Sequence, residues 1–80
     1  MNETKTVISI KEYGKIKIEL KQLLDERNMT RNSLAKASNT RFEVIKKWCE
    51  NDVEKLDLDV LARICYVLDC SPSDIIKYSK

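Results

Sequence analysis

The side chains best suited to chemistry gather in one basic stretch, residues 30–51. This stretch holds five Lys or Arg against two Glu, a net charge of 5 − 2 = +3, whereas residues 50–59 hold five acidic side chains against one Lys, a net charge of 1 − 5 = −4. Guanidinium and ammonium groups donate charge-assisted hydrogen bonds to phosphate oxygens. A basic face beside an acidic segment would orient the chain toward a polyanion. Two ordinary solvated surfaces are the plainer alternative.

No second kind of chemistry is indicated by the residue types. The 80-residue chain has no His, and its three Cys lack the paired spacing of a zinc site or a disulfide framework. Cys49, Cys65 and Cys70 stand at positions that otherwise read as apolar, which predicts buried free thiols. No glycine-rich phosphate loop and no nucleophile beside a base is present. We therefore expect no catalytic activity, no cofactor, no metal and no small-molecule ligand.

Two short helical patterns around a polar turn would position the basic side chains. Thr30 suits the N-cap of the first helix, because its hydroxyl can accept from a backbone N–H one turn on. Asn39 suits the turn, since Asn tolerates the left-handed conformation. Apolar residues then recur on one face of a second helix, expected over about 41–51: Val44, Ile45, Trp48 and Cys49. This arrangement predicts a helix-turn-helix unit.

The rest of the chain supplies partners for these two helices. We expect an extended segment over 16–18, a helix over about 19–27 and a turn at 28–29. A further helix over about 58–68 begins after the N-cap Asp57, and Asn51 ends the helix before it. Its helical stripe is expected to lie in the core: Leu58, Leu61, Ile64, Cys65 and Leu68.

The two ends of the chain carry the remaining expectations. Residues 71–74 have the signature of a capping box with Pro at the first helical position, which predicts a short fifth helix including Ile75 and Ile76. Alternatively, residues 75–78 run extended and pair with 16–18 in a two-stranded ribbon. Residues 6–10 are β-branched and suit a short strand. The interpretation is one domain over 16–80 with an N-terminal extension over 1–15. No segment reads as a membrane span or a signal peptide, which indicates a cytoplasmic protein.

With these elements placed, residues 16–77 resemble the lambda-repressor-like family of helix-turn-helix regulators, which includes Cro and Xre-type proteins. The resemblance rests on Thr30 and Arg31, which open the first helix of the helix-turn-helix unit, on the spacing between Leu34 and Ile45, and on Trp48. It also covers the closing helix pair over 58–76. Asn replaces the family's usual glycine at positions 39 and 51, Arg31 replaces a frequent Gln, and Arg41 stands where a small capping residue is usual.

The resemblance implies an all-α, five-helix DNA-binding domain whose second motif helix enters the major groove of double-stranded DNA. Arg41 or Lys46 would donate to guanine, Glu43 would accept from cytosine, and Phe42 would pack on a thymine methyl group. The contacts would come from eight residues: Thr30, Arg31, Asn32, Arg41, Phe42, Glu43, Lys46 and Lys47.

Several of these assignments have alternatives. Phe42 can pack against protein, Glu43 can pair with Lys46 or Lys47 on its own helix, and Lys47 can be merely solvated. If Thr40 caps the recognition helix, Arg41 lies in the first turn and reaches bases; if Arg41 is the cap, it holds a phosphate.

The resemblance also implies a sequence-specific transcriptional regulator, acting as a repressor and as a homodimer. Pairing would use the fifth helix and the terminal segments, through Val7, Ile8, Ile10 or Tyr78. The alternative is a protein-interaction module on the same fold, such as an antitoxin-like domain, which exposed Phe42 and the acidic segment 50–59 would serve.

Overall fold

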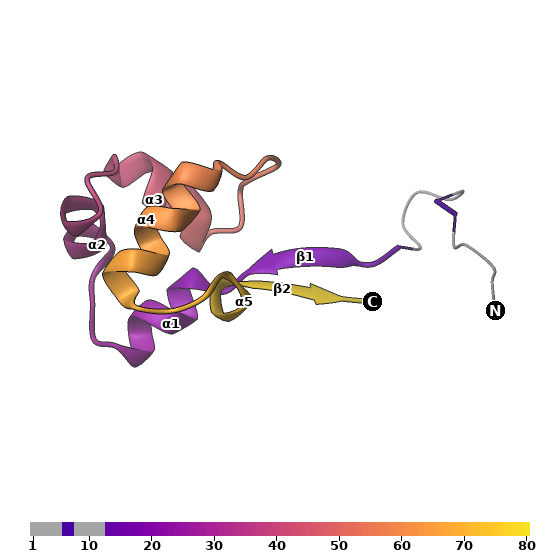
Figure 1. Ribbon diagram of the computed structural model, residues 1–80, viewed down its shortest axis with the longest axis horizontal. Coiled ribbons are helices and arrows are strands. Elements are labelled where there is room, and N and C mark those ends of the chain that lie inside the picture. Colours follow the sequence, from indigo (N-terminus) through magenta and orange to yellow (C-terminus); the bar gives the residue numbers. More distant parts are fainter. Residues whose placement is uncertain (1–5, 8–12) are drawn as a thin grey trace.

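A helical body with a projecting two-stranded ribbon makes up the computed structural model, which describes residues 6–7 and 13–80 (Figure 1). Residues 8–10 of the strand expected over 6–10, and most of the expected extension, lie outside these residues; residues 6–7 are described and form no strand. In chain order the elements are β1 (Lys15–Ile18), α1 (Leu20–Glu26), α2 (Arg31–Ala37), α3 (Phe42–Cys49), α4 (Leu58–Leu68), α5 (Pro72–Ile75) and β2 (Ile76–Ser79). The predicted five-helix fold class is confirmed, and the ribbon is present as well.

The ribbon joins the two ends of the described chain. β1 and β2 are antiparallel, with Ile18 opposite Ile76 and Ile16 opposite Tyr78. The prediction that Ile76 belongs to the fifth helix is wrong. Ile76 is extended, with φ −115° and ψ 126°, because the capping box supports one helical turn and the chain then pairs with β1.

Hydrogen bonds to capping side chains explain where α2, α4 and α5 begin. The Thr30 hydroxyl accepts from the Ser33 N–H at 3.0 Å, as the N-cap prediction requires. The Asp57 carboxylate accepts from two backbone N–H groups at the start of α4. At α5 the Asp74 carboxylate accepts from the Ser71 N–H at 2.9 Å, which closes the predicted capping box. Each bond satisfies a donor that the first helical turn leaves without an intrahelical partner.

The core takes one fully buried side chain from every helix: Leu20, Leu34, Ile45, Ile64 and Ile75. Trp48 joins them with 3% of its surface exposed, which confirms the core position predicted for it. Burying an aliphatic side chain of this size stabilises the fold by about 1.5–3 kcal/mol. The core therefore fixes α3 by its inner face and leaves its outer face toward solvent.

Two expectations about the core are wrong. Leu58 is 74% exposed, because Val60, Leu61, Ile64 and Leu68 set the core face of α4 and the first residue of the helix points away from it. Cys65 and Cys70 pack against the core but are only half-buried, because Ile64 and Leu68 take the buried face of α4, whereas Cys49 is buried as expected.

Candidate nucleic-acid interface

The turn between α2 and α3 is held by short hydrogen bonds to backbone carbonyls. Thr40 N–H donates to the Ala35 carbonyl at 2.9 Å, and the buried Ser38 hydroxyl donates to the Leu34 carbonyl at 2.6 Å. Asn39 adopts the left-handed conformation with φ +52°, as predicted. These bonds lock the angle at which α3 leaves the turn.

α3 is shorter than predicted at both ends, and its start settles the alternative at Thr40 and Arg41. Arg41 is the N-cap residue, with extended φ −63° and ψ 142°, and its carbonyl accepts from the N–H groups of Val44 and Ile45. The Thr40 hydroxyl donates instead to the Ser38 carbonyl. The helix ends at Cys49, because Asn51 is left-handed with φ +60°. Arg41 and Asn51, the approximate limits expected for the helix, therefore flank it. Arg41 is the cap, as one of the two alternatives had it, and Asn51 is the left-handed residue predicted to end the helix.

The outer face of α3 presents a row of polar and aromatic side chains. Its exposed members and the exposed N-cap residue before it are all predicted contact residues: Arg41, Phe42, Glu43, Lys46 and Lys47. Phe42 is 42% exposed, so its ring is available to a partner. Lys46 and Lys47 lie in the last turn of α3, where their positive charges interact favourably with the negative end of the helix dipole.

A shallow hollow of about 500 Å³ lies between α2, the turn after it and the start of α3. Asn32 and Lys36 line it from α2, and Arg41 and Phe42 line it from the start of α3. The structure thus brings three of the predicted residues together. Glu43, Lys46 and Lys47 do not line this hollow. Lys36 also lines the hollow but was not predicted as a contact; its one signal in the sequence is its positive charge within the basic stretch 30–51.

Charge pairing leaves most of this surface uncompensated. Arg31 Nη1 lies 3.7 Å from Glu50 Oε2, and both side chains are partly exposed. Such a pair contributes less than about 1 kcal/mol, so it does not withdraw Arg31 from an anionic ligand. Over the part of the chain that the structure describes, the α3 carboxylate of Glu43 forms no ion pair with Lys46 or Lys47. The same-helix pairing considered for Glu43 is absent there.

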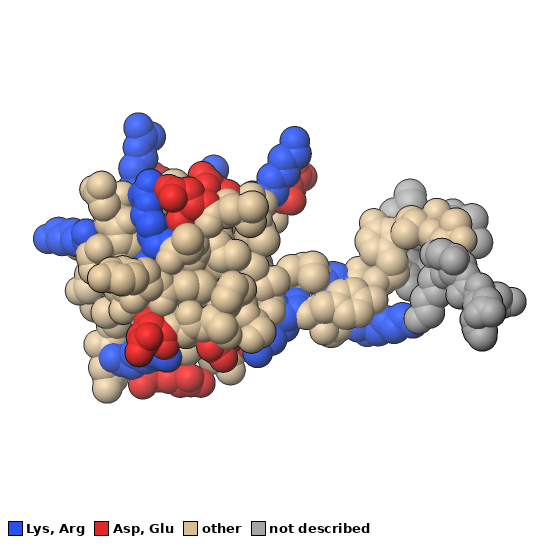
Figure 2. All heavy atoms as spheres, in the orientation of Figure 1, with Lys and Arg blue, Asp and Glu red and all other residues tan. Residues whose placement is uncertain are grey.

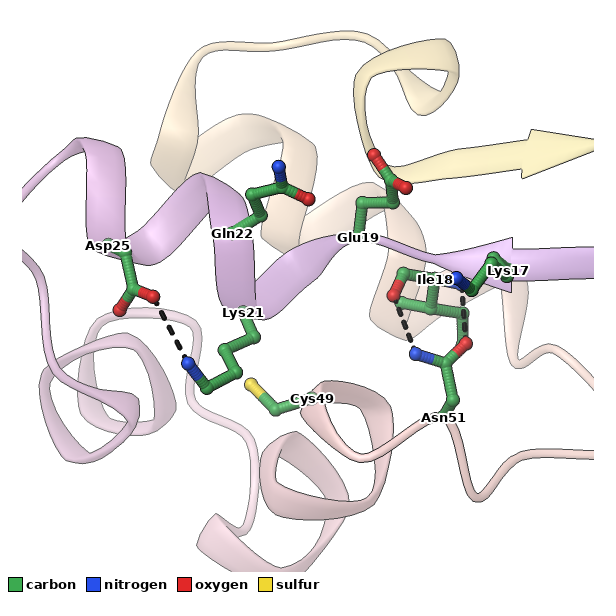
Figure 3. Close-up of a pocket in the computed structure, with 8 residues that line it drawn as sticks. All are labelled: Lys17, Ile18, Glu19, Lys21, Gln22, Asp25, Cys49 and Asn51. Carbon is green, nitrogen blue, oxygen red and sulfur yellow. Dashed lines mark hydrogen bonds and ion pairs between the residues drawn. The ribbon is translucent and has the colours of Figure 1, made fainter.

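The far end of α3 is tied to the ribbon by one side chain (Figure 3). Asn51 Oδ1 accepts from the Ile18 N–H at 2.6 Å, and Asn51 Nδ2 donates to the Ile18 carbonyl at 2.8 Å. The amide therefore pairs with β1 as a neighbouring strand would. Nothing in the sequence signals this contact beyond Asn at a position where glycine is usual.

The Cys49 thiol, which lies beside this junction, is unreactive at neutral pH. Burial raises the pKa of Cys49, and the positive charge of Arg31 opposes that rise only in part. A raised pKa keeps the thiol protonated and unreactive at neutral pH. Among the described residues no group of three His, Cys, Asp or Glu side chains is placed to hold a metal ion. None of the described helices has the length and apolar character that a membrane crossing requires.

Comparison with known proteins agrees with this geometry. Residues 19–80 match the Cro/C1-type helix-turn-helix DNA-binding domain, and the chain belongs to this family. It is therefore a DNA-binding domain of the kind found in transcriptional regulators.

Two solved structures are similar to this chain. One is a candidate DNA-binding protein from Bacteroides fragilis, with 25% sequence identity and a TM-score of 0.69, covering 79% of this chain and 100% of its own. The other is the transcriptional regulator VanUg, with 26% identity and a TM-score of 0.68, covering 96% of this chain and 97% of its own. A comparison with curated proteins gave no match.

Proposed function

We propose that this protein is a sequence-specific transcriptional repressor that inserts α3 into the major groove of double-stranded DNA. The observation that carries the proposal is the division of α3 into two faces. Ile45 and Trp48 anchor the buried face, and the cations of the outer face form no ion pair within the described residues. Repression would follow from occupying the DNA site, with no catalytic step. Such a regulator would act in the cytoplasm, where its DNA is accessible.

Base recognition would come from the first turns of α3. Each base pair shows a distinct pattern of donors and acceptors in the major groove. Lys46 would donate to guanine O6 and N7, Glu43 would accept from cytosine N4, and Phe42 would contact a thymine methyl group. Arg41, as the N-cap residue, is better placed to hold a phosphate.

Phosphate contacts would set the register of the domain on the duplex. Arg31 and Asn32 at the start of α2, together with Lys47 on α3, are the predicted donors, and all three side chains reach solvent. The Thr30 hydroxyl is engaged in capping α2, so its contribution would be to place that helix start.

We further propose that the protein binds DNA as a homodimer, which would present two recognition helices to successive turns of one DNA face. Ile16 and Tyr78 lie opposite each other on one face of the ribbon and are 57% and 60% exposed. An isolated two-stranded ribbon is only marginally stable in water, so a partner covering this apolar face would stabilise it. Val7 is also exposed; the other predicted pairing residues, Ile8 and Ile10, lie outside the described residues.

The test is duplex binding measured by fluorescence anisotropy at two salt concentrations, for the wild type and for Arg41→Ala and Lys46→Ala. Loss of a base contact such as that of Lys46 should cost about 1–3 kcal/mol and relax sequence preference, whereas loss of a phosphate contact such as that of Arg41 should weaken all duplexes alike. Lys55→Ala, in the acidic loop, is the matched control. Wild-type binding that responds neither to salt nor to the two substitutions would refute the proposal.

A further inference from the structure

One face of the ribbon is cationic. Side chains alternate between the two faces of a strand, so Lys15, Lys17 and Lys77 share with Ser79 the face opposite Ile16 and Tyr78. All three lysines are exposed, and Lys80 follows directly after β2. Figure 2 shows basic side chains along the ribbon and no acidic side chain on its described part in this view.

The charges on this face repel one another. Lys17 lies directly opposite Lys77 in the antiparallel register, and like charges in that position destabilise a strand pair. In the described part of the chain, no carboxylate forms an ion pair with any of these lysines. The free protein therefore carries a repulsion that a bound polyanion would relieve.

The cationic face opens beside the end of the recognition helix. Lys17 lines a hollow of about 300 Å³ together with Cys49, the last residue of α3, and with Asn51 (Figure 3). The carboxylates of Glu19 and Asp25 also line this hollow, so the cationic face begins at Lys17 and runs outward along the ribbon. The paired hydrogen bonds between Asn51 and Ile18 fix the base of the ribbon to this end of α3. The base of the ribbon, with Lys17, therefore lies beside the C-terminal end of α3.

We propose that the cationic face of the ribbon is a second DNA-binding surface, with Lys17 and Lys77 holding phosphates beside the site that α3 reads. Lysine is a compact point charge on a flexible stem, so this contact adds affinity without sequence preference. The inference rests on the proposed function, because the phosphates belong to the same duplex.

The experiment measures the salt dependence of duplex binding for the wild type, Lys17→Gln, Lys77→Gln and the double variant. Removing one phosphate contact should lower the slope of log K against log salt by about 0.9 per bound chain, and removing two should lower it by about 1.8. Lys55→Gln removes the same charge from the acidic loop and should leave the slope unchanged. Thermal unfolding of the free variants should show midpoints no lower than that of the wild type, because the facing charges are removed.

The outcomes separate the two proposals. Unchanged slopes for Lys17→Gln and Lys77→Gln, or an equal fall for Lys55→Gln, would overturn the ribbon contact while leaving α3 recognition intact. A wild type that binds no duplex overturns both. A lower duplex affinity together with an unchanged or higher unfolding midpoint supports the ribbon contact, because misfolding would lower both the affinity and the midpoint.

Discussion

The clamp between Asn51 and Ile18 gives a sharp prediction, because glycine can replace Asn51 without disturbing the backbone. Asn51 has φ +60°, a conformation that glycine adopts freely. Asn51→Gly would remove only the amide and its two hydrogen bonds, of 2.6 and 2.8 Å, to the backbone of β1.

The expected change in stability can be worked out from these two bonds. Each contributes about 0.5–1.5 kcal/mol, for a total of about 1–3 kcal/mol. Relief of left-handed strain at a non-glycine residue offsets part of this, and strain is smaller for Asn than for most residues. We therefore expect Asn51→Gly to lower the free energy of unfolding by about 1–2 kcal/mol, with a fall in the midpoint of about 4–8 °C for each kcal/mol.

Chemical denaturation followed by circular dichroism measures this change, and the chain offers a matched control. Asn39 is also left-handed, with φ +52°, but its described hydrogen bonds use only its backbone. Asn39→Gly should therefore be neutral or slightly stabilising. Equal unfolding free energies for the Asn51→Gly variant and the wild type would show that the clamp contributes nothing and would refute the reasoning.

Three further perturbations follow from single contacts. Thr30→Ala removes the α2 cap and should cost about 1 kcal/mol of unfolding free energy, measured by urea titration. Trp48→Ala opens the core beneath α3 and should cost about 3–5 kcal/mol in the same assay. Hydrogen bonds from the Ser71 N–H and hydroxyl lower the pKa of Asp74 below its usual 3.8. Its contribution to stability is therefore present above pH 3.8 and disappears as the pH falls through the lowered value. Asp74→Asn should be less stable than the wild type at about pH 7, with a difference that vanishes in acid.

Features that depend on neighbouring residues could be predicted from the sequence. The caps at Thr30, Asp57 and Ser71 each need only a hydrogen bond within three residues, and the left-handed turns at Asn39 and Asn51 need only a residue that tolerates that backbone. The helix-turn-helix followed from these signals and from the apolar spacing. Its local signals all agree with the final fold, which is why it could be predicted.

Features that depend on contacts between distant residues could not be predicted from the sequence. The Asn51 amide meets Ile18 across 33 residues, and no local pattern encodes that meeting. Thr40 and Arg41 were both acceptable starts for α3, and the choice was made by the turn, where the Thr40 hydroxyl bonds to Ser38. Leu58 matched the apolar stripe of α4, yet in the fold Val60 lies on the buried face of α4 and Leu58 is exposed.

Selection of bound sequences from a pool of random duplex DNA tests the central claim most directly. If α3 reads bases and the protein binds as a dimer, the selected pool should converge on a motif with two-fold symmetry and half-sites about 10 base pairs apart, centre to centre. Lys46→Ala should weaken the base preference at one position of each half-site. A pool that stays as random as its starting material, although the protein retains DNA, would contradict sequence-specific recognition by α3.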